Sequence, residues 1–273
     1  MVGEVGTLLA GYKKHLRDGD AYELFHENVG EELGDVLWYL ANAAEKWGLS
    51  LSDLAERNLA KTSDRWPSNR PRRRKPSEQF DTDFPRSQRL PRTFEVTIVP
   101  SDNPQGPEPK IEVWWKGTRR ADSLGDNTYD DSGYRFHDVF HLANAAVLGW
   151  SPVARAKIFG CKRKDDGVVD AVEDGGRAIV IEEGIAAYVF AYARRHNFLK
   201  GVDRIDFDVL KTVRLLTGDL EVAQRPLWEV EDGIFQGFAV WRELRTRGGG
   251  VVIGDLSARS VGFRHLTGSR VRT

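Results

Sequence analysis

A helical repeat of apolar side chains in residues 31–48 constrains the fold of this chain more than any other feature. The apolar residues recur at intervals of three and four, the spacing that places side chains on one face of an α-helix. They are Leu33, Val36, Leu37, Leu40, Ala44 and Trp47. Gly48 follows, a residue typical of helix C-termini. Glu32 and Asp35 lie three residues apart beside this stripe, so both carboxylates share one side of the predicted helix.

Two carboxylates one helical turn apart suit a hard divalent cation, because Mg²⁺ is typically held by one or two carboxylates together with substrate phosphates. The motif Ser50-x-x-Asp53 resembles a capping box and predicts a further helix. That helix carries Asn58, Lys61 and Arg65. Amide and cationic side chains in such a row favour binding of a phosphate group. The pattern therefore predicts a magnesium site for a phosphate-bearing substrate.

These residues resemble the MazG-like nucleotide pyrophosphohydrolases of the all-α NTP pyrophosphatase superfamily. The family signature is a Glu-rich first helix, then Glu-x-x-Asp, then Asn-x-x-Lys-x-x-x-Arg-aromatic-Pro. The segment Glu32-Leu33-Gly34-Asp35 matches the second element, and residues 58–67 match the third. In the first element Glu4 matches, whereas Thr7 stands where the family has a carboxylate. The resemblance is specific in residues 31–67 and covers roughly the first quarter of the chain.

The resemblance implies hydrolysis of a nucleoside triphosphate (NTP or dNTP) to the monophosphate and pyrophosphate. Mg²⁺, with Mn²⁺ as an alternative, would be held by Glu32, Asp35 and Glu4, which are also the expected catalytic residues. The expected substrate-binding residues are Trp38, which would stack on the base, Asn58, Lys61 and Arg65. A homodimer or tetramer is implied, because the family completes its site across a helical interface.

Two other functions stay open at this point. Thr7 removes one metal ligand or the group that orients the attacking water, and this loss can abolish activity. The first domain would then be a degenerate nucleotide sensor or oligomerisation module. Alternatively, a metal-dependent hydrolase site lies in the C-terminal domain.

That second site is predicted from two motifs. His137-Asp138-x-x-His141 places two imidazoles at i and i+4, a spacing that lets both reach one metal ion. Glu182 and Glu183 lie within an apolar helix, where an unpaired carboxylate is costly. His137, His141 and Glu183 would form a two-His, one-carboxylate site for a second divalent metal. Glu183 is favoured over Glu182 because Gly184 follows it and lets another backbone approach. A buried hydrogen-bond network is the structural alternative.

The predicted fold class is mainly α, in three parts. Residues 1–66 form an all-α helical domain, and residues 67–92 form a solvated linker rich in Pro and Arg. Residues 93–273 form an α+β domain dominated by helices with short β-hairpins, in which strands at both ends pair into one small sheet. The region from the His137 helix through Gly248 to Phe263 resembles the C-terminal domain fused to some MazG-like proteins.

Composition excludes several classes of partner. The net charge of −1 over 273 residues provides no global field for nucleic acid. The basic run at residues 70–75 has no interleaved aromatic residue and is interpreted as linker. No apolar segment reaches the ~18 residues of a membrane span or resembles a signal peptide. The single Cys161 fits a reducing compartment, and a cytoplasmic protein is expected.

Overall fold

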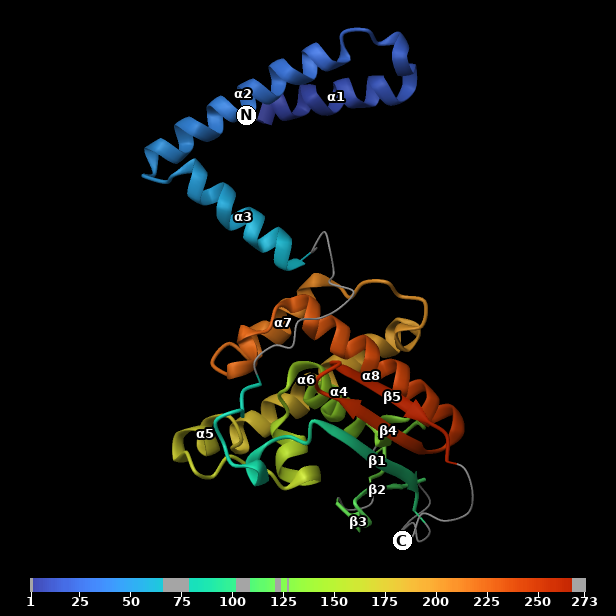
Figure 1. The fold of residues 1–273 in the computed structure, drawn as a ribbon. Helices are drawn as coiled ribbons and strands as arrows, with labels where there is room; N and C mark the ends of the chain where they lie inside the picture. The colour runs from blue at the N-terminus through green and yellow to red at the C-terminus, as the bar shows by residue number, and fades with distance from the viewer. Residues whose placement is uncertain (1, 66–78, 102–108, 121–123, 127, 267–273) are drawn as a thin grey trace. The chain divides into compact units, whose positions relative to one another are not determined.

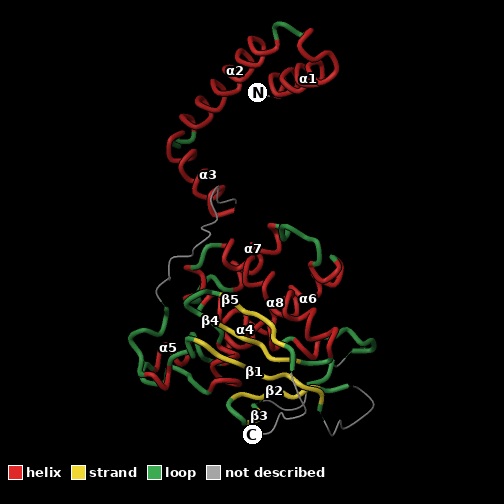
Figure 2. Tube along the Cα trace, turned by 45° about the vertical axis from the view of Figure 1, so that its right-hand side comes forward, coloured by secondary structure: helices red, strands yellow, loops and turns green. Residues whose placement is uncertain are grey.

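The computed structural model describes residues 2–65, 79–101, 109–120, 124–126 and 128–266 (Figure 1). Contacts divide the chain into two compact units, Met1–Ser63 (unit 1) and Asp64–Thr273 (unit 2). Unit 1 is helical, and unit 2 combines helices with one antiparallel sheet (Figure 2), so the predicted mainly α fold class is confirmed. Among the described residues, none of the helices combines the length and apolar composition that crossing a bilayer requires.

Unit 1 begins with an antiparallel helix pair, which Figures 1 and 2 show from two directions. The helices are α1 (Val2–Asp18), the short turn η1 (Gly19–Ala21), α2 (Phe25–Lys46) and α3 (Leu51–Arg65). The stop after α2 is as predicted: Gly48 adopts a φ of +64°, and the Leu49 N–H donates to the Ala44 carbonyl. The Asp53 N–H donates to Ser50 Oγ at 3.3 Å, so Ser50 caps α3.

The core of unit 1 is thin. Among the described residues of its helices, Ala44 alone is buried. Large apolar side chains are exposed on all three helices, including Leu9, Leu37 and Leu59, and Trp47 is exposed directly after α2. A helix pair has an apolar stripe on one side only, and it must cover that stripe with another element to be stable.

Unit 2 is organised on a five-stranded antiparallel sheet with the order β3-β2-β1-β4-β5. The strands are β1 (Thr93–Pro100), β2 (Ile111–Trp115), β3 (Thr118–Arg119), β4 (Gly250–Asp255) and β5 (Ser260–Arg264). β1 pairs with β4, so strands from both ends of the unit do form one sheet. Phe94 lies opposite Gly254, where a Cβ would come within 2.1 Å of the Phe94 ring. Only glycine leaves room for that ring.

Helices cover the face of the sheet that carries Phe94, Val96 and Ile98. The longer ones are α4 (Asp138–Leu148), α6 (Gly176–Arg195), α7 (Phe207–Leu216) and α8 (Leu227–Arg247). The shorter ones are η2 (Arg86–Gln88), η3 (Tyr134–Phe136), the π-helix η4 (Ala154–Phe159), α5 (Gly167–Val172), η5 (Asn197–Leu199) and η6 (Glu221–Gln224). α4 and α8 pack on one another and on β4 and β5, forming the centre of the core.

Residues 79–92 differ from the prediction of a solvated linker. Leu90 and Asp81 are buried in unit 2, and Phe80 packs against its core. Asp81 accepts hydrogen bonds from the Leu90 N–H and from Arg92, and it pairs with the buried Arg155 of η4 at 2.8 Å. The Asp81–Arg155 pair joins residues 74 positions apart in the sequence, which is why local composition did not reveal it. The basic run at residues 70–75 lies outside the described residues.

Replacing Asp81 by Asn should destabilise unit 2 by about 3–5 kcal/mol, because the buried charge of Arg155 would lose its closest carboxylate and keep only Asp174, at 3.7 Å. Urea unfolding followed by tryptophan fluorescence measures this change. Asp83→Asn is the matched control, since Asp83 is exposed two residues away. Equal stability of the two variants would show that the Asp81–Arg155 pair does not hold this segment.

Candidate functional site

In unit 1, α1 and α2 enclose a groove of about 410 Å³. Thr7, Gly11 and Lys14 line it from α1, and Glu31 and Glu32 line it from α2. Thr7 donates a hydrogen bond to the Gly3 carbonyl within its own helix. Position 7, where the family signature has a carboxylate, therefore faces the same groove as Glu32.

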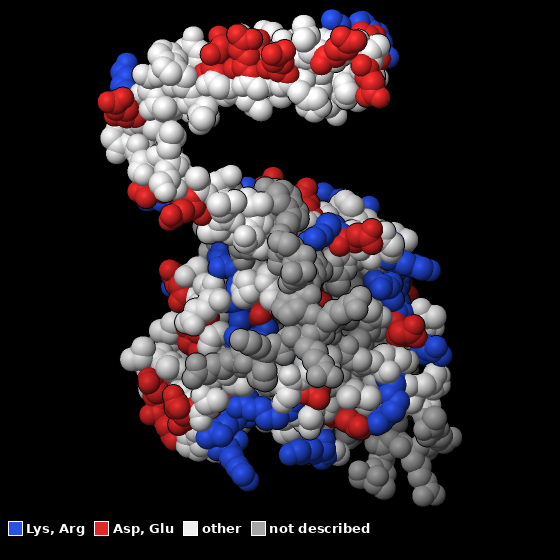
Figure 3. Space-filling model, turned by 45° about the horizontal axis from the view of Figure 1, so that its top comes forward, with Lys and Arg blue, Asp and Glu red and all other residues white. Residues whose placement is uncertain are grey.

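The structure does not bring all predicted ligands together in one chain. Asp35 is exposed on α2, and Glu4 lies on α1 without lining the groove. Within the described part of unit 1, Glu4, Glu32 and Asp35 do not converge at the distances of metal ligands. Acidic side chains gather in patches on the face of unit 1 that Figure 3 shows.

The predicted substrate-binding residues are also spread out. Trp38 is exposed on α2 and packs edge-on against Tyr39. Asn58 is exposed on α3, a helix that turns away from the α1–α2 pair (Figures 1 and 2). The side chains of Lys61 and Arg65 lie outside the described residues.

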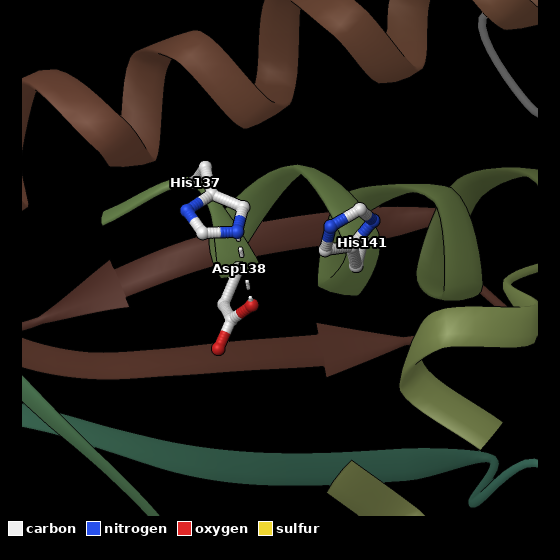
Figure 4. Close-up of side chains that lie close together, drawn as sticks. All are labelled: His137, Asp138 and His141. Atoms are coloured by element: carbon white, nitrogen blue, oxygen red, sulfur yellow. Dashed lines mark ion pairs between the residues drawn. The ribbon is translucent and has the colours of Figure 1, made fainter. Parts of the chain in front are cut away.

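In unit 2 the predicted cluster is assembled where α4 begins beside α6. Figure 4 shows the His137 ring facing the Asp138 carboxylate, with His141 one turn further along α4. One ligand atom from each of these three residues lies within 4.8 Å of the others. Glu183 of α6 completes the group, since its Oε2 lies 3.3 Å from His141 Nε2 and 3.7 Å from His137 Nε2.

Glu182 contacts this cluster on the buried side of His141. Its carboxylate is fully buried and accepts hydrogen bonds from Asn144 Nδ2, Ser151 Oγ and the Val153 N–H, all at 2.9–3.0 Å. Its Oε1 also lies 3.2 Å from His141 Nδ1, as an ion pair that is not aligned as a hydrogen bond. Glu182 and Glu183 therefore face different nitrogens of one imidazole, although they are adjacent in sequence.

Charges within the cluster alter its protonation. Burial opposes a charge on His141, but the carboxylates of Glu182, Glu183 and Asp138 together outweigh it and raise the pKa of His141 to about 10. The hydrogen bond from His141 lowers the pKa of Glu183 to about 2. Burial lowers the pKa of His137, and burial with the charges of Glu183 and Asp138 raises the pKa of Tyr134 to about 12. Lys157 Nζ lies 3.0 Å from Glu183 Oε1.

Sequence reasoning found His137, His141 and Glu183 but missed how the cluster is supported. The argument from Gly184 is wrong, because a Cβ there would meet nothing within 4 Å. The partners Asn144, Ser151 and Lys157 were not predicted. They carry no local signal, since they meet the acidic pair of α6 from 26 to 38 residues away.

Two family models match successive parts of the chain. The MazG nucleotide pyrophosphohydrolase domain matches residues 4–69. The MazG C-terminal domain matches residues 75–267, which is more than half of the chain. The chain belongs to the MazG family. The resemblance predicted from residues 31–67 and from the His137–Phe263 region is confirmed, and the family supports nucleotide pyrophosphohydrolase chemistry in general.

One curated relative is a phage protein. A stretch of 67 residues is 39% identical to the "Gene 37 protein" of Mycobacterium phage L5, covering 24% of this chain and 59% of that protein. The similarity thus spans less than two thirds of the relative. No solved structure matches the chain.

The pKa shifts predict how pH affects the fold without metal. A raised pKa at His141 stabilises the fold fully below pH 6.5, and this contribution is lost as pH rises through about 10. A lowered pKa at Glu183 stabilises it above pH 4.5, and this contribution is lost as pH falls through about 2. Glu183→Gln should therefore lower the unfolding temperature of chelator-treated protein more at pH 6 than at pH 10.5.

Differential scanning calorimetry at the two pH values measures this difference. Glu243→Gln is the control, because Glu243 pairs with Arg247 on an exposed helix face. An equal loss for Glu183→Gln at both pH values would contradict a charged His141–Glu183 pair.

Proposed function

We propose that this MazG-family protein is a Mg²⁺-dependent nucleoside triphosphate pyrophosphohydrolase, which converts an NTP or dNTP and water to the monophosphate and pyrophosphate. The observation that carries the proposal is the match of residues 4–69 to the MazG nucleotide pyrophosphohydrolase domain. The groove of unit 1 is consistent with the proposal, because residues from two elements of the family signature, Glu32 and Thr7, both line it. Mn²⁺ is an alternative ion.

Glu32, Asp35 and Glu4 would hold the metal, and hard carboxylate oxygens suit Mg²⁺. When bound, the ion supplies charge neutralisation of the triphosphate and a more acidic water. The remaining chemistry is binding and orientation by the chain. Lys61 and Arg65 carry the positive charges that pair with phosphate oxygens, and Asn58 supplies an amide. Trp38 presents an exposed ring on which a base can stack.

We further propose that a second copy of the chain completes this site. The α1–α2 pair leaves Leu9, Leu33 and Leu37 exposed, and two such pairs can close their apolar stripes as a four-helix bundle. A partner's carboxylates would then approach those of the first copy. This arrangement accounts for Glu4, Glu32 and Asp35 standing apart within one chain.

A sensor without turnover is the second candidate, and one observation favours it. Thr7 faces the groove beside Glu32, at the position where the family signature supplies a carboxylate. A threonine hydroxyl binds Mg²⁺ more weakly than a carboxylate because it carries no charge. Nucleotide binding without pyrophosphate release would select this candidate.

Removing the charge of a proposed ligand should abolish most of the turnover. Glu32→Gln and Asp35→Asn should each lower kcat/KM at least about 100-fold, equivalent to about 3 kcal/mol of transition-state stabilisation. The measurement is pyrophosphate release from a panel of NTPs and dNTPs with Mg²⁺ or Mn²⁺. Glu45→Gln, an exposed position on the same helix, should leave the rate unchanged.

Two outcomes would contradict the proposal. If both charge removals leave the rate intact, unit 1 is not the catalyst. If the products are a nucleoside diphosphate and orthophosphate, the bond between the α and β phosphates is not the one that is hydrolysed. Thr7→Glu should leave activity unchanged or raise it.

The proposed assembly predicts that a charge in the α2 stripe separates the copies. Leu37→Asp should convert a dimer or tetramer to a monomer, because an interface core does not accommodate an unpaired carboxylate. Light scattering during gel filtration gives the mass. Leu215→Asp is the control, since Leu215 is a leucine exposed on α7 of unit 2. A monomeric wild-type protein would contradict the proposed assembly.

A further inference from the structure

The ligand atoms of the unit 2 cluster lie close to the separations found around a bound metal ion. Ligands about 2.0–2.1 Å from a tetrahedral ion lie about 3.3 Å from one another. Glu183 Oε2 lies 3.3 Å from His141 Nε2 and 3.7 Å from His137 Nε2, and Asp138 Oδ1 lies 3.8 Å from His137 Nε2. We propose that His137, Asp138, His141 and Glu183 bind one divalent transition-metal ion, such as Zn²⁺. This site is separate from the proposed Mg²⁺ site of unit 1.

Both imidazoles are held in the orientation that a metal requires. His137 Nδ1 donates to the Tyr134 carbonyl at 2.9 Å, and the Tyr134 ring stacks on the His137 ring at 4.6 Å. His141 Nδ1 faces Glu182. In each case Nδ1 lies against a protein oxygen, at 2.9 Å for His137 and 3.2 Å for His141, and Nε2 lies on the side of Glu183. A carboxylate or carbonyl behind a metal-binding histidine is a regular feature of such sites, because it fixes the ring and its tautomer.

The buried carboxylate of Asp138 is a second observation that points to a bound cation, independent of the two histidines. Its side chain is 8% exposed. Among the described residues its carboxylate accepts no hydrogen bond, and it pairs with His137 Nε2 at 3.8 Å. A buried carboxylate normally has a hydrogen-bond donor or a metal as partner, because burial removes its water. A cation between Asp138 and the two histidines would supply that partner.

The donor set selects the class of ion. Two imidazole nitrogens favour Zn²⁺, Mn²⁺ or another transition ion over Mg²⁺, which prefers oxygen ligands. The site is also open to solvent, because the side chains of His137 and Glu183 are 13% and 29% exposed. An ion there can be loaded from solution.

The ion can therefore be titrated into the full-length protein. Calorimetry should use a Glu32→Gln/Asp35→Asn double variant, so that carboxylates of unit 1 do not contribute. We expect one Zn²⁺ per chain, little competition from Mg²⁺, and a higher unfolding temperature. Because unit 1 is disabled in this variant, the result does not depend on pyrophosphohydrolase activity.

Ligand variants then locate the ion. His137→Gln and Glu183→Gln should each weaken Zn²⁺ binding at least tenfold, and Glu182→Gln should weaken it by about 10–100-fold by loosening His141. His196→Gln is the matched control. His196 repeats the local geometry of His137, with Nδ1 on the Tyr192 carbonyl and its ring stacked on Tyr192, but it lies on the surface.

Three outcomes would overturn the proposal. They are no Zn²⁺ binding, binding that His137→Gln and Glu183→Gln leave unchanged, and an equal loss in His196→Gln. A fall in the stability of the metal-free protein with no effect on Zn²⁺ would identify the cluster as a hydrogen-bond network that joins α4 to α6. His141 is fully buried, and its replacement is avoided because it can unfold the unit.

Discussion

The organisation of unit 2 depends on the buried carboxylate of Glu182. It accepts three hydrogen bonds, from α4, from the segment after it and from the backbone before η4, and it faces His141. A buried carboxylate without such donors would cost several kcal/mol, so all these elements must be in place together. The same bonds hold the Glu182 carboxylate against His141 Nδ1. They thereby help to orient His141, whose Nε2 faces the cluster at the solvent edge. Stability and site geometry therefore rest on one group.

The two units differ in how their apolar surfaces and charged groups are covered. Unit 2 has a sheet covered by helices, an extended apolar core and buried ion pairs such as Asp81–Arg155. Unit 1 has three helices and an exposed apolar stripe that includes Leu37. A second copy that covers this stripe would also gather the separated carboxylates of Glu32 and Asp35. We thus infer that assembly of two copies positions the site residues of unit 1, whereas internal hydrogen bonds position those of unit 2.

Periodic patterns made much of the fold predictable. The apolar repeat from Leu33 to Trp47 predicted α2, and alternation at Phe94, Val96 and Ile98 predicted β1. The His137-x-x-x-His141 spacing predicted the paired imidazoles, because helix geometry fixes which residues share a face. The rest depends on contacts between distant segments. Nothing local to Asp81, Ser151 or Lys157 shows that it meets a partner 26 to 74 residues away. Unit 1 shows the opposite case, since a sequence signature predicts its site residues although one chain does not bring them together.

The central claim is that the chain carries two chemically distinct metal sites, one of oxygen donors and one containing imidazole. X-ray absorption at the zinc edge tests this directly, on full-length protein with one equivalent of Zn²⁺ and excess Mg²⁺. The account predicts imidazole scattering from two histidines, with Zn–N distances of about 2.0–2.1 Å. A first shell of oxygen alone, without imidazole scattering, would contradict it.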